Sequence, residues 1–465
     1  MIGIARLGTY FPRRRLDRGL LAKAWGGRAS GTRTMAAPDE DALTMAVEAL
    51  AACVGETPPA DVGALYFAST SAPYLEKQVA SMIATAADLP RDLATADFGG
   101  SVRAGLGALR AALDAVGAGS VRAALVAAAD CRLAEPGSEL ETQLGDGAAA
   151  ALVGRHEVIA ELVTAASVAE EFTYFWRTDE QRYVQVADAR FGNQYGVQAY
   201  VPEALGAALR KAELPAAKLA RVAVALPDPR AAAAVVKKAG LDPEAQLVPS
   251  LAGEAGVLGC AEPMVLLSRA LEGVQPGDFV AMAAYGEGAD AMIFRATHAL
   301  RVHPPRPIAD ALAGGIPVPS YERYLRARGI LPFDVGGELV PTYIEWKELK
   351  QDVRLWGSRC TACGLVQYPQ EVVCMGCHAP GKTVEHKLRR EGTVFTFTID
   401  HLIGQVPEHP MPMVVVELDG GGRVYLQGTD CAEGEIAVGK RVRLTYRRLH
   451  QAGGNRNYFW KVRPA

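Results

Sequence analysis

The chain has 465 residues, which at roughly 150 residues per domain predicts about three folding units. Hydrophobic residues make up 49% and charged residues 22% of the chain, a balance that excludes disordered, fibrous and coiled-coil proteins. The 49 basic and 52 acidic side chains give a net charge of −3, so we expect no nucleic-acid partner and no attachment to a membrane surface.

The apolar pattern predicts neither a membrane span nor a leader. A spanning helix needs about 18 uninterrupted apolar residues. The best runs, such as 121–129, are much shorter and contain Arg122. At the amino terminus the apolar residues precede the arginines at 13–15, the reverse of the order in a secretory signal. We therefore expect a cytoplasmic protein.

Residues 1–297 alternate short, β-branched apolar runs with longer alanine-rich stretches of helical period. This alternation is typical of an α/β layer fold, in which helices cover a sheet. Strands are predicted at 64–68, 123–128, 222–226 and 279–284, and helices at 40–54, 76–87, 101–116, 202–214, 230–239 and 263–271.

The composition changes at residues 298–342, where prolines and a Gly-Gly pair interrupt any helix or central strand. We expect a linker here that contains a short helix at 321–328. Beyond it the alanine richness falls, and a glycine-rich turn at 419–422 predicts a hairpin because glycine supplies positive φ. A small all-β region is predicted, with strands at 393–399, 413–418, 424–426 and 441–446.

Four cysteines form two pairs, Cys360-x2-Cys363 and Cys374-x2-Cys377, with ten residues between the pairs. This spacing lets four thiolates converge on one ion. Zinc is favoured because thiolates are soft ligands, although iron in a rubredoxin-like site would use the same four sulfurs. Four protein ligands leave no open coordination position, so we expect a structural metal. His378 follows the last cysteine and is not needed as a ligand.

Several segments of the first 297 residues, taken in their order, resemble the thiolase superfamily. They include DEDALTMAVEAL at 39–50, TADFGGSVRAGLGAL at 95–109, GDGAAAALVG at 145–154 and GEAGVLGCAEPMVLLSRALE at 253–272. The likeness is strongest to the branch of HMG-CoA synthase and ketoacyl synthase III. It implies a thiolase-like five-layer αβαβα sandwich, with an acyl-CoA tunnel leading to a buried site between two similar halves.

The carboxyl-terminal part resembles the rubredoxin-like zinc ribbon and OB-fold barrel that accompany thiolases and HMG-CoA synthases. The ribbon is expected at 343–387 and the barrel at 388–465. The resemblance implies a module that bridges subunits and helps to enclose coenzyme A. An OB fold alone suggests oligonucleotide binding, but this one lacks an alternation of aromatic and basic residues, so nucleic acid is not expected.

Four positions that carry roles in the resembled family are altered here. The resemblance places Asp97 where the family has its nucleophilic cysteine, and Thr70 where it has a glutamate base. It places Pro227 at the family histidine and Glu254 at the family asparagine. A carboxylate is a poor acyl acceptor, because a mixed anhydride hydrolyses more readily than a thioester. Ordinary Claisen condensation is therefore expected to be lost.

Asp97 and Glu254 are the candidate catalytic residues that remain. If the family geometry holds, both face one pocket, where they would act in general acid/base chemistry on an acyl-CoA. The structural alternative is that they cap helices or pair with Arg103. Free cysteines are usually small buried hydrophobic residues. Among them Cys260 is the best candidate for a chemical role, because the corresponding family loop lines the active site.

The leading hypothesis is a catalytically altered, HMG-CoA-synthase-like subunit that binds a coenzyme A thioester. It would partner a thiolase or an acyl-CoA lyase in C–C bond formation or cleavage, as a homodimer or within a heteromeric complex. The alternative is a self-sufficient acyltransferase of the HMG-CoA synthase type, or a lyase, that uses Asp97 and Glu254. A third hypothesis is a scaffold that binds acyl-CoA and takes part in no reaction.

Overall fold

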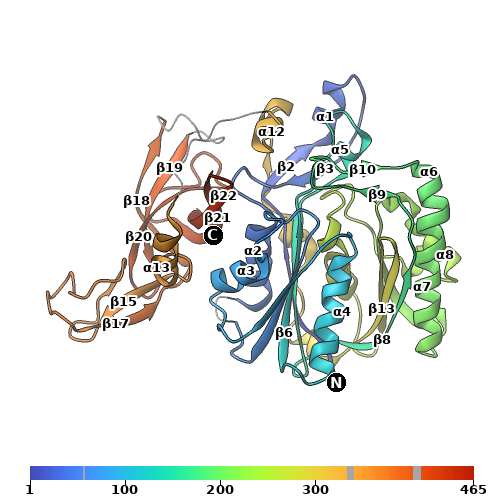
Figure 1. Ribbon diagram of the computed structural model, residues 1–465, viewed down its shortest axis with the longest axis horizontal. Coiled ribbons are helices and arrows are strands. Elements are labelled where there is room, and N and C mark those ends of the chain that lie inside the picture. The colour runs from blue at the N-terminus through green and yellow to red at the C-terminus, as the bar shows by residue number, and fades with distance from the viewer. Residues whose placement is uncertain (56–57, 332–339, 402–409) are drawn as a thin grey trace. The chain divides into compact units, whose positions relative to one another are not determined.

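The computed structural model describes residues 1–55, 58–331, 340–401 and 410–465 (Figure 1). These residues form two compact units. The first unit comprises Met1–Ala36, Asp41–Ala84 and Leu89–Tyr321, and the second comprises Ala37–Glu40, Thr85–Asp88 and Glu322–Ala465. In the described ranges no helix is both long and apolar enough to cross a bilayer.

The first unit is built on a mixed sheet of nine strands in the order β11-β12-β13-β8-β1-β7-β6-β4-β5. Parallel pairs join β11 to β12 and β4 to both β5 and β6, and the other neighbours are antiparallel. The strands are β1 (Gly3–Tyr10), β4 (Val62–Ala68), β5 (Ala94–Phe98), β6 (Ala123–Asp130), β7 (Gly147–Gly154), β8 (Ala160–Ala169), β11 (Leu219–Ala225), β12 (Phe279–Tyr285) and β13 (Gly288–Ala296). All four strands predicted for this region are confirmed.

Helices cover this sheet, and two of them pack between its two halves. Helices α4 and α10 pack together and form part of one core with strands from both halves of the sheet. Helix α2 packs on β7 and β1, whereas α7 packs on β13 and β8 (Figure 1). This gives the expected layer order, with the two halves joined through β1 and β8 into one sheet. The helices predicted here are confirmed, as α2 (Ala42–Val54), α3 (Val79–Ala86), α4 (Ala104–Gly117), α7 (Gln198–Lys211), α8 (Ala232–Lys238) and α10 (Glu262–Leu271).

Local sequence explains how these helices start and approach one another. At the start of α2 the Asp41 side chain accepts from the Thr44 amide at 3.1 Å, and the Thr44 hydroxyl accepts from the Asp41 amide at 2.9 Å. This reciprocal capping satisfies two donors that a helix start otherwise leaves free. In α4, a Cβ at Gly105 would lie 2.1 Å from the carbonyl oxygen of Cys260, so only glycine permits the close approach.

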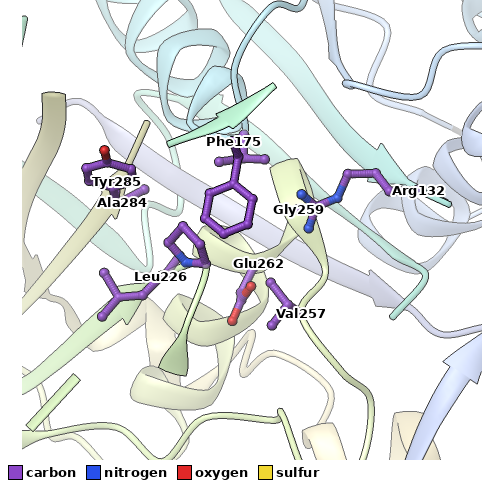
Figure 2. Close-up of a pocket in the computed structure, with 11 residues that line it drawn as sticks. Arg132, Phe175, Leu226, Val257, Gly259, Glu262, Ala284 and Tyr285 are labelled. Carbon is purple, nitrogen blue, oxygen red and sulfur yellow. The ribbon is translucent and has the colours of Figure 1, made fainter. Parts of the chain in front are cut away.

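Smaller elements complete the first unit and place its loops. A six-residue π-helix, η1 (Gly192–Val197), leads into α7. The others are β2 (Arg14–Asp17), α1 (Arg18–Ala24), β3 (Thr32–Met35), α5 (Glu139–Gln143), β9 (Phe175–Trp176), β10 (Gln185–Val186), α6 (Ala189–Phe191), η2 (Ala216–Lys218), η3 (Pro229–Ala231), α9 (Pro243–Gln246) and η4 (Gly259–Ala261). The ends of β6, β11 and β12 carry residues that line a pocket (Figure 2).

Part of the segment expected to be a linker at 298–342 belongs to the first unit. It contains η5 (His298–Arg301), α11 (Ile308–Leu312) and β14 (Ile316–Pro317), which pairs with β2. Leu300 and Ile308 are buried in the core despite the surrounding prolines. The expected short helix is present as α12 (Tyr321–Ala327), while residues 332–339 lie outside the described part.

In its described residues the second unit contains most of α12, helix α13 (Thr342–Asp352) and two antiparallel sheets. The smaller sheet has the order β16-β15-β17 and the larger the order β20-β19-β18-β21-β22. Positive φ angles of 83°, 104° and 94° at Gly420, Gly421 and Gly422 confirm the glycine turn between β19 and β20. The strands are β15 (Trp356–Cys360), β16 (Val366–Gln367), β17 (Thr383–Lys387), β18 (Glu391–Asp400), β19 (Met411–Leu418), β20 (Arg423–Gln427), β21 (Arg441–Ala452) and β22 (Asn455–Pro464).

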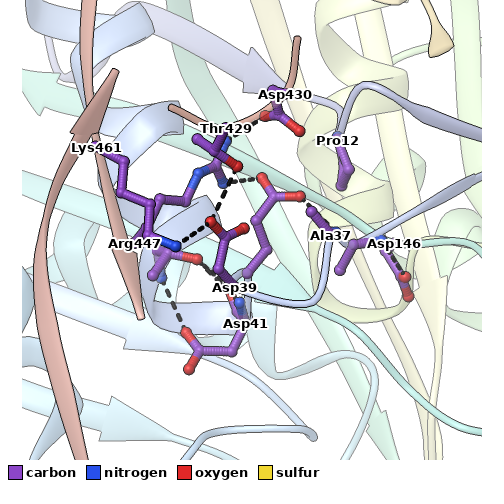
Figure 3. Close-up of polar contacts among 12 residues, drawn as sticks. Pro12, Ala37, Asp39, Asp41, Asp146, Thr429, Asp430, Arg447 and Lys461 are labelled. Atoms are coloured by element: carbon purple, nitrogen blue, oxygen red, sulfur yellow. Dashed lines mark hydrogen bonds and ion pairs between the residues drawn. The ribbon is translucent and has the colours of Figure 1, made fainter. Parts of the chain in front are cut away.

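A buried ionic network lies inside the second unit (Figure 3). The Arg447 guanidinium is fully buried and pairs with Glu40 and with Asp430, the latter at 2.5 Å. Lys461 contacts Asp39 at 2.9 Å. Burial opposes ionisation of Asp39, but Lys461 and Arg447 outweigh it and lower the pKa of Asp39 to about 2. The segment Ala37–Glu40 is thus held in this unit by charges that have little contact with water.

Replacing Arg447 tests how much this network stabilises the second unit. We expect Arg447→Met to lower the free energy of unfolding by about 3–5 kcal/mol, because Glu40 and Asp430 lose their shared counter-charge in a buried site. Denaturant unfolding followed by the fluorescence of Trp460, which is buried in the same unit, measures the change.

The matched control is Arg423→Met, which removes an exposed ion pair with Glu417 in the same sheet. A loss below about 1 kcal/mol is expected there. Equal, small losses in both variants would contradict a stabilising role for the buried network.

Candidate functional site

The pocket of the first unit is formed where strands end and helices begin (Figure 2). Its position at the carboxyl ends of β6, β11 and β12 is the usual place for a ligand site in an open α/β sheet. Most of the wall is apolar, and its polar side chains are Arg132, Glu262 and Tyr285. The 11 lining residues are Val102, Arg132, Phe175, Ala225, Leu226, Pro227, Val257, Gly259, Glu262, Ala284 and Tyr285.

Glu262 is the first residue of α10 and is only 4% exposed. Its Oε2 accepts from the backbone N–H of Leu258 at 3.2 Å. Burial raises the pKa of Glu262 to about 8, although the Arg132 guanidinium and the hydrogen bond from Leu258 act in the opposite direction. At neutral pH this carboxyl is therefore mainly protonated.

Asp130, at the end of β6, is a second buried carboxylate and differs from Glu262 in its hydrogen bonds. It accepts from the hydroxyls of Ser69, Thr70 and Ser71 at 3.0, 3.0 and 2.8 Å. It also accepts from the backbone N–H groups of Thr70 and Cys260, both at 2.8 Å. Its lone pairs are thus engaged, and Asp130 positions the segment after β4 and the turn before α10.

Two buried thiols of the first unit are placed where they are poor nucleophiles. Cys260 is fully buried, and its Sγ lies 3.4 Å from the carbonyl oxygen of Ser101. Burial and the Asp130 carboxylate raise the pKa of Cys260 well above its usual value. Burial also raises the pKa of Cys53 to about 12. A nucleophilic cysteine needs the opposite shift, because the thiolate is the reactive form.

The two acidic residues predicted as catalytic lie outside the lining of this pocket. Asp97, on the edge strand β5, is exposed and accepts from the backbone N–H groups of Val79 and Ala80 at 2.7 and 2.8 Å. It therefore caps α3, as in the structural alternative. Glu254 is exposed, and its carbonyl oxygen accepts from the Thr32 hydroxyl at 3.1 Å. Their catalytic role stays a prediction.

Sequence reasoning did not single out Glu262 or Arg132. A signal was available for Glu262, because it is the only charged residue in the apolar run 255–267, which is typical of a buried helix. A charged residue in such a run needs a partner or a shifted pKa. Arg132 follows an apolar strand directly, and no periodicity indicates that it lines a pocket.

The four predicted metal ligands converge in the second unit. The Sγ atoms of Cys360 and Cys377 lie 3.7 Å apart, and those of Cys363 and Cys374 lie 3.5 Å apart. All four lie within 4.8 Å of one another. Zinc–sulfur bonds of about 2.3 Å in a tetrahedron require sulfur separations of about 3.8 Å, so the four thiols fit one zinc ion. In each pair a backbone N–H two residues after the first cysteine donates to its Sγ at 3.4 Å.

Family models match the second unit. Residues 348–383 match the ChsH2 rubredoxin-like zinc ribbon domain, and residues 385–447 match the ChsH2 C-terminal OB-fold domain. The prediction of a zinc ribbon followed by an OB-fold barrel is therefore confirmed.

Solved structures show that the first unit has a thiolase-like fold. MvaS in complex with 3-hydroxy-3-methylglutaryl coenzyme A matches with a TM-score of 0.62 and 22% identity, over 73% of this chain and 94% of that one. The 3-oxoacyl-[acyl-carrier-protein] synthase III of Aquifex aeolicus matches with a TM-score of 0.56 and 19% identity, over 63% and 100%. At these identities the likeness establishes the fold alone.

Sequence relatives identify the family within this fold. Hydroxymethylglutaryl-CoA synthase of Thermococcus onnurineus is 30% identical over 303 residues, which are 63% of this chain and 85% of the relative. That of Methanopyrus kandleri is 27% identical over 368 residues, covering 76% of this chain and 98% of the relative. The chain belongs to the hydroxymethylglutaryl-CoA synthase family.

The raised pKa of Glu262 makes stability depend on pH in a way that Glu262→Gln removes. Between its ordinary value near 4.5 and about 8, the carboxyl ionises in the unfolded chain but stays protonated in the folded one. Stability is therefore lost as pH rises through this window, by on the order of 4 kcal/mol. Thermal unfolding at about pH 5 and about pH 8 measures this effect. The melting temperature of Glu262→Gln should increase relative to that of the parent chain as pH rises. A difference in melting temperature that is the same at both pH values would contradict the raised pKa of Glu262.

Metal analysis tests the four-cysteine site. We expect one zinc ion per chain by elemental analysis, and loss of that zinc in Cys363→Ser, because a three-sulfur site binds more weakly. The matched control is Cys431→Ser, which removes a cysteine outside the cluster and should keep the metal. Retention of a full equivalent by the first variant, or iron in place of zinc, would contradict the assignment.

Proposed function

We propose that this chain is an acyl-CoA-handling member of its family in which catalysis is altered. In this proposal it works as a subunit with a thiolase or an acyl-CoA lyase, in the formation or cleavage of C–C bonds. Binding of a coenzyme A thioester is supported by the fold shared with structures named as complexes with 3-hydroxy-3-methylglutaryl coenzyme A and with CoA. Family membership supports the same class of substrate.

The observation that carries the altered catalysis is the chemistry of the pocket. Acyl transfer through a covalent enzyme intermediate needs an ionisable nucleophile that faces the substrate. Among the described residues that line the pocket there is no cysteine, and the wall beside α4 carries Val102. The neighbouring Cys260 has its thiol turned to a backbone carbonyl, with a raised pKa. A thiolase partner would supply the missing thiolate.

The second unit would bridge subunits and help to enclose coenzyme A. Its zinc ribbon exposes apolar side chains that water solvates poorly, at Val372, Val373 and Met375, with exposed fractions of 73%, 46% and 55%. Exposed apolar groups gathered near a rigid metal site are typical of a surface that binds another protein. They support assembly with a partner, either as a homodimer or as a heteromeric complex.

A self-sufficient acyltransferase or lyase that uses Asp97 and Glu254 has weaker support. Both carboxylate oxygens of Asp97 accept hydrogen bonds from backbone amides at the start of α3. A carboxylate engaged in this way is a poorer base and a poorer nucleophile, because reaction would break those bonds.

The proposal is tested by purifying the chain alone and together with the thiolase encoded nearest to its gene. We expect the two proteins to co-purify, and condensation or thiolysis to require the thiolase. After incubation with acetyl-CoA, mass spectrometry of the mixture should find the acetyl thioester on the thiolase. Strong condensation or thiolysis by the isolated chain, or an acetyl thioester on one of its own cysteines, would contradict the proposal.

A further inference from the structure

The four cysteines of the zinc ribbon differ in their exposure to solvent. Cys360 and Cys374, the first residues of the two pairs, are 1% and 0% exposed, whereas Cys363 and Cys377 are exposed. The rate at which a cysteine is oxidised depends on its thiolate character and on solvent access. A metal-bound sulfur is a thiolate, so the ribbon presents two oxidisable sulfurs to solvent and keeps two others buried.

Each exposed sulfur lies close to a buried sulfur of the other pair. The Sγ atom of Cys377 lies 3.7 Å from that of Cys360, and the Sγ atom of Cys363 lies 3.5 Å from that of Cys374. A disulfide bond measures about 2.05 Å, so the two sulfurs of each couple have to approach by about 1.5 Å. Each exposed thiolate therefore has a second thiolate in reach, which is the arrangement found in redox-sensing cysteines.

We propose that the four-cysteine site is a reversible redox switch, in which a hydroperoxide converts the thiolates into two disulfides, Cys360–Cys377 and Cys363–Cys374, and the ribbon gives up its metal. The exposed Cys363 and Cys377 react first, and the buried cysteines complete the disulfides. The site then has a regulatory role in addition to its structural one. This inference concerns the metal site alone and does not depend on the proposed function.

The oxidation is balanced with the hydroperoxide as the oxidant. The exposed thiolate attacks one peroxide oxygen, an S–O bond forms, and the O–O bond breaks to give a sulfenic acid and water. The buried thiolate then attacks this sulfur, an S–S bond forms, and the S–O bond breaks to release a second water. Each disulfide thus reduces one molecule of hydrogen peroxide and takes two protons from solvent.

Oxidation removes the charges that bind the ion but leaves the ribbon connected. The electrons come from sulfur, because zinc is not redox-active, and the thiolate is the form that binds the metal. The side chain of Gln367 donates to the carbonyl oxygen of Val373 at 3.1 Å and accepts from the amide of Met375 at 3.0 Å. These hydrogen bonds and the two new cross-links hold the two pairs together. We therefore expect reduction in the presence of zinc to restore the site.

The cysteines outside the ribbon serve as internal references. Cys53 and Cys260 are buried, while Cys131 and Cys431 are half-buried. Burial raises the pKa of Cys53 to about 12 and raises the pKa of Cys260 well above its usual value. These four thiols should therefore react with peroxide more slowly than the exposed thiolates of the ribbon.

The test treats the reduced, zinc-loaded full chain with hydrogen peroxide. A chromophoric chelator measures the released zinc, and alkylation followed by proteolysis and mass spectrometry locates the disulfides. We expect loss of the whole zinc equivalent, together with the disulfides Cys360–Cys377 and Cys363–Cys374. At low peroxide, the sulfenic-acid trap dimedone should label Cys363 and Cys377, and not their buried partners. Dithiothreitol with added zinc should return the full equivalent of metal.

A control variant and the disulfide map make the outcomes distinct. Cys431→Ser removes a cysteine outside the cluster and should release zinc as the parent chain does. Disulfides formed within each Cys-x2-Cys pair, or zinc retained while the half-buried cysteines are oxidised, would overturn this inference. So would zinc release that dithiothreitol and zinc do not reverse, or a purified chain that contains no zinc. Co-purification with a thiolase tests the proposed function separately, and its result does not affect this inference.

Discussion

The pocket of the first unit depends on one buried carboxylate, Asp130. A charge with no exposed surface persists only when donors surround it. Here the donors are hydroxyls and amides of residues 69–71 and the amide of Cys260. These donors come from the segment after β4 and from the turn before α10, which are far apart in the sequence. Satisfying one carboxyl group therefore joins the segment after β4 to the turn before α10, and Gly259 of that turn lines the pocket.

Asp130 and Glu262 are two buried carboxyl groups that differ in the number of hydrogen bonds they accept. Both are buried, and Arg132 acts on the pKa of Glu262. Asp130 accepts five hydrogen bonds, so a ligand would compete with all of them. Glu262 accepts one, so burial dominates and raises its pKa to about 8. Two buried carboxyl groups thus differ in what their surroundings do to them, because one is held by many donors and the other by a single amide.

Features that depend on neighbouring residues were predictable from the sequence, and features that depend on distant residues were not. The spacing of the two cysteine pairs is local, and it predicted the convergence of Cys360 and Cys377, seventeen residues apart. Strands such as β6 were predicted because an apolar run carries its own signal. The donors of Asp130 are about 60 and 130 residues away, and no local pattern indicates them. Leu300 and Ile308 enter the core from a segment whose prolines suggested a linker.

The second unit also contains contacts that no local sequence pattern indicates, between residues even farther apart in the chain. Arg447 lies on β21 in a stretch, Arg441–Arg448, whose polar residues suggest a strand with one exposed face. In the structure its side chain is fully buried because Glu40, 407 residues earlier, supplies a charge. Asp88 likewise pairs with Arg354 at 3.0 Å and Lys387 at 3.2 Å inside this unit.

These contacts mean that the folding unit is larger than the segment that family models recognise. The matched residues, 348–383 and 385–447, contain buried or half-buried cations whose counter-charges come from Ala37–Glu40 and Thr85–Asp88. A buried cation without its partner is strongly destabilising. An excised ribbon and barrel would have to expose or neutralise these groups. The buried cations of the carboxyl-terminal module therefore depend on acidic residues of the amino-terminal sequence of the same chain.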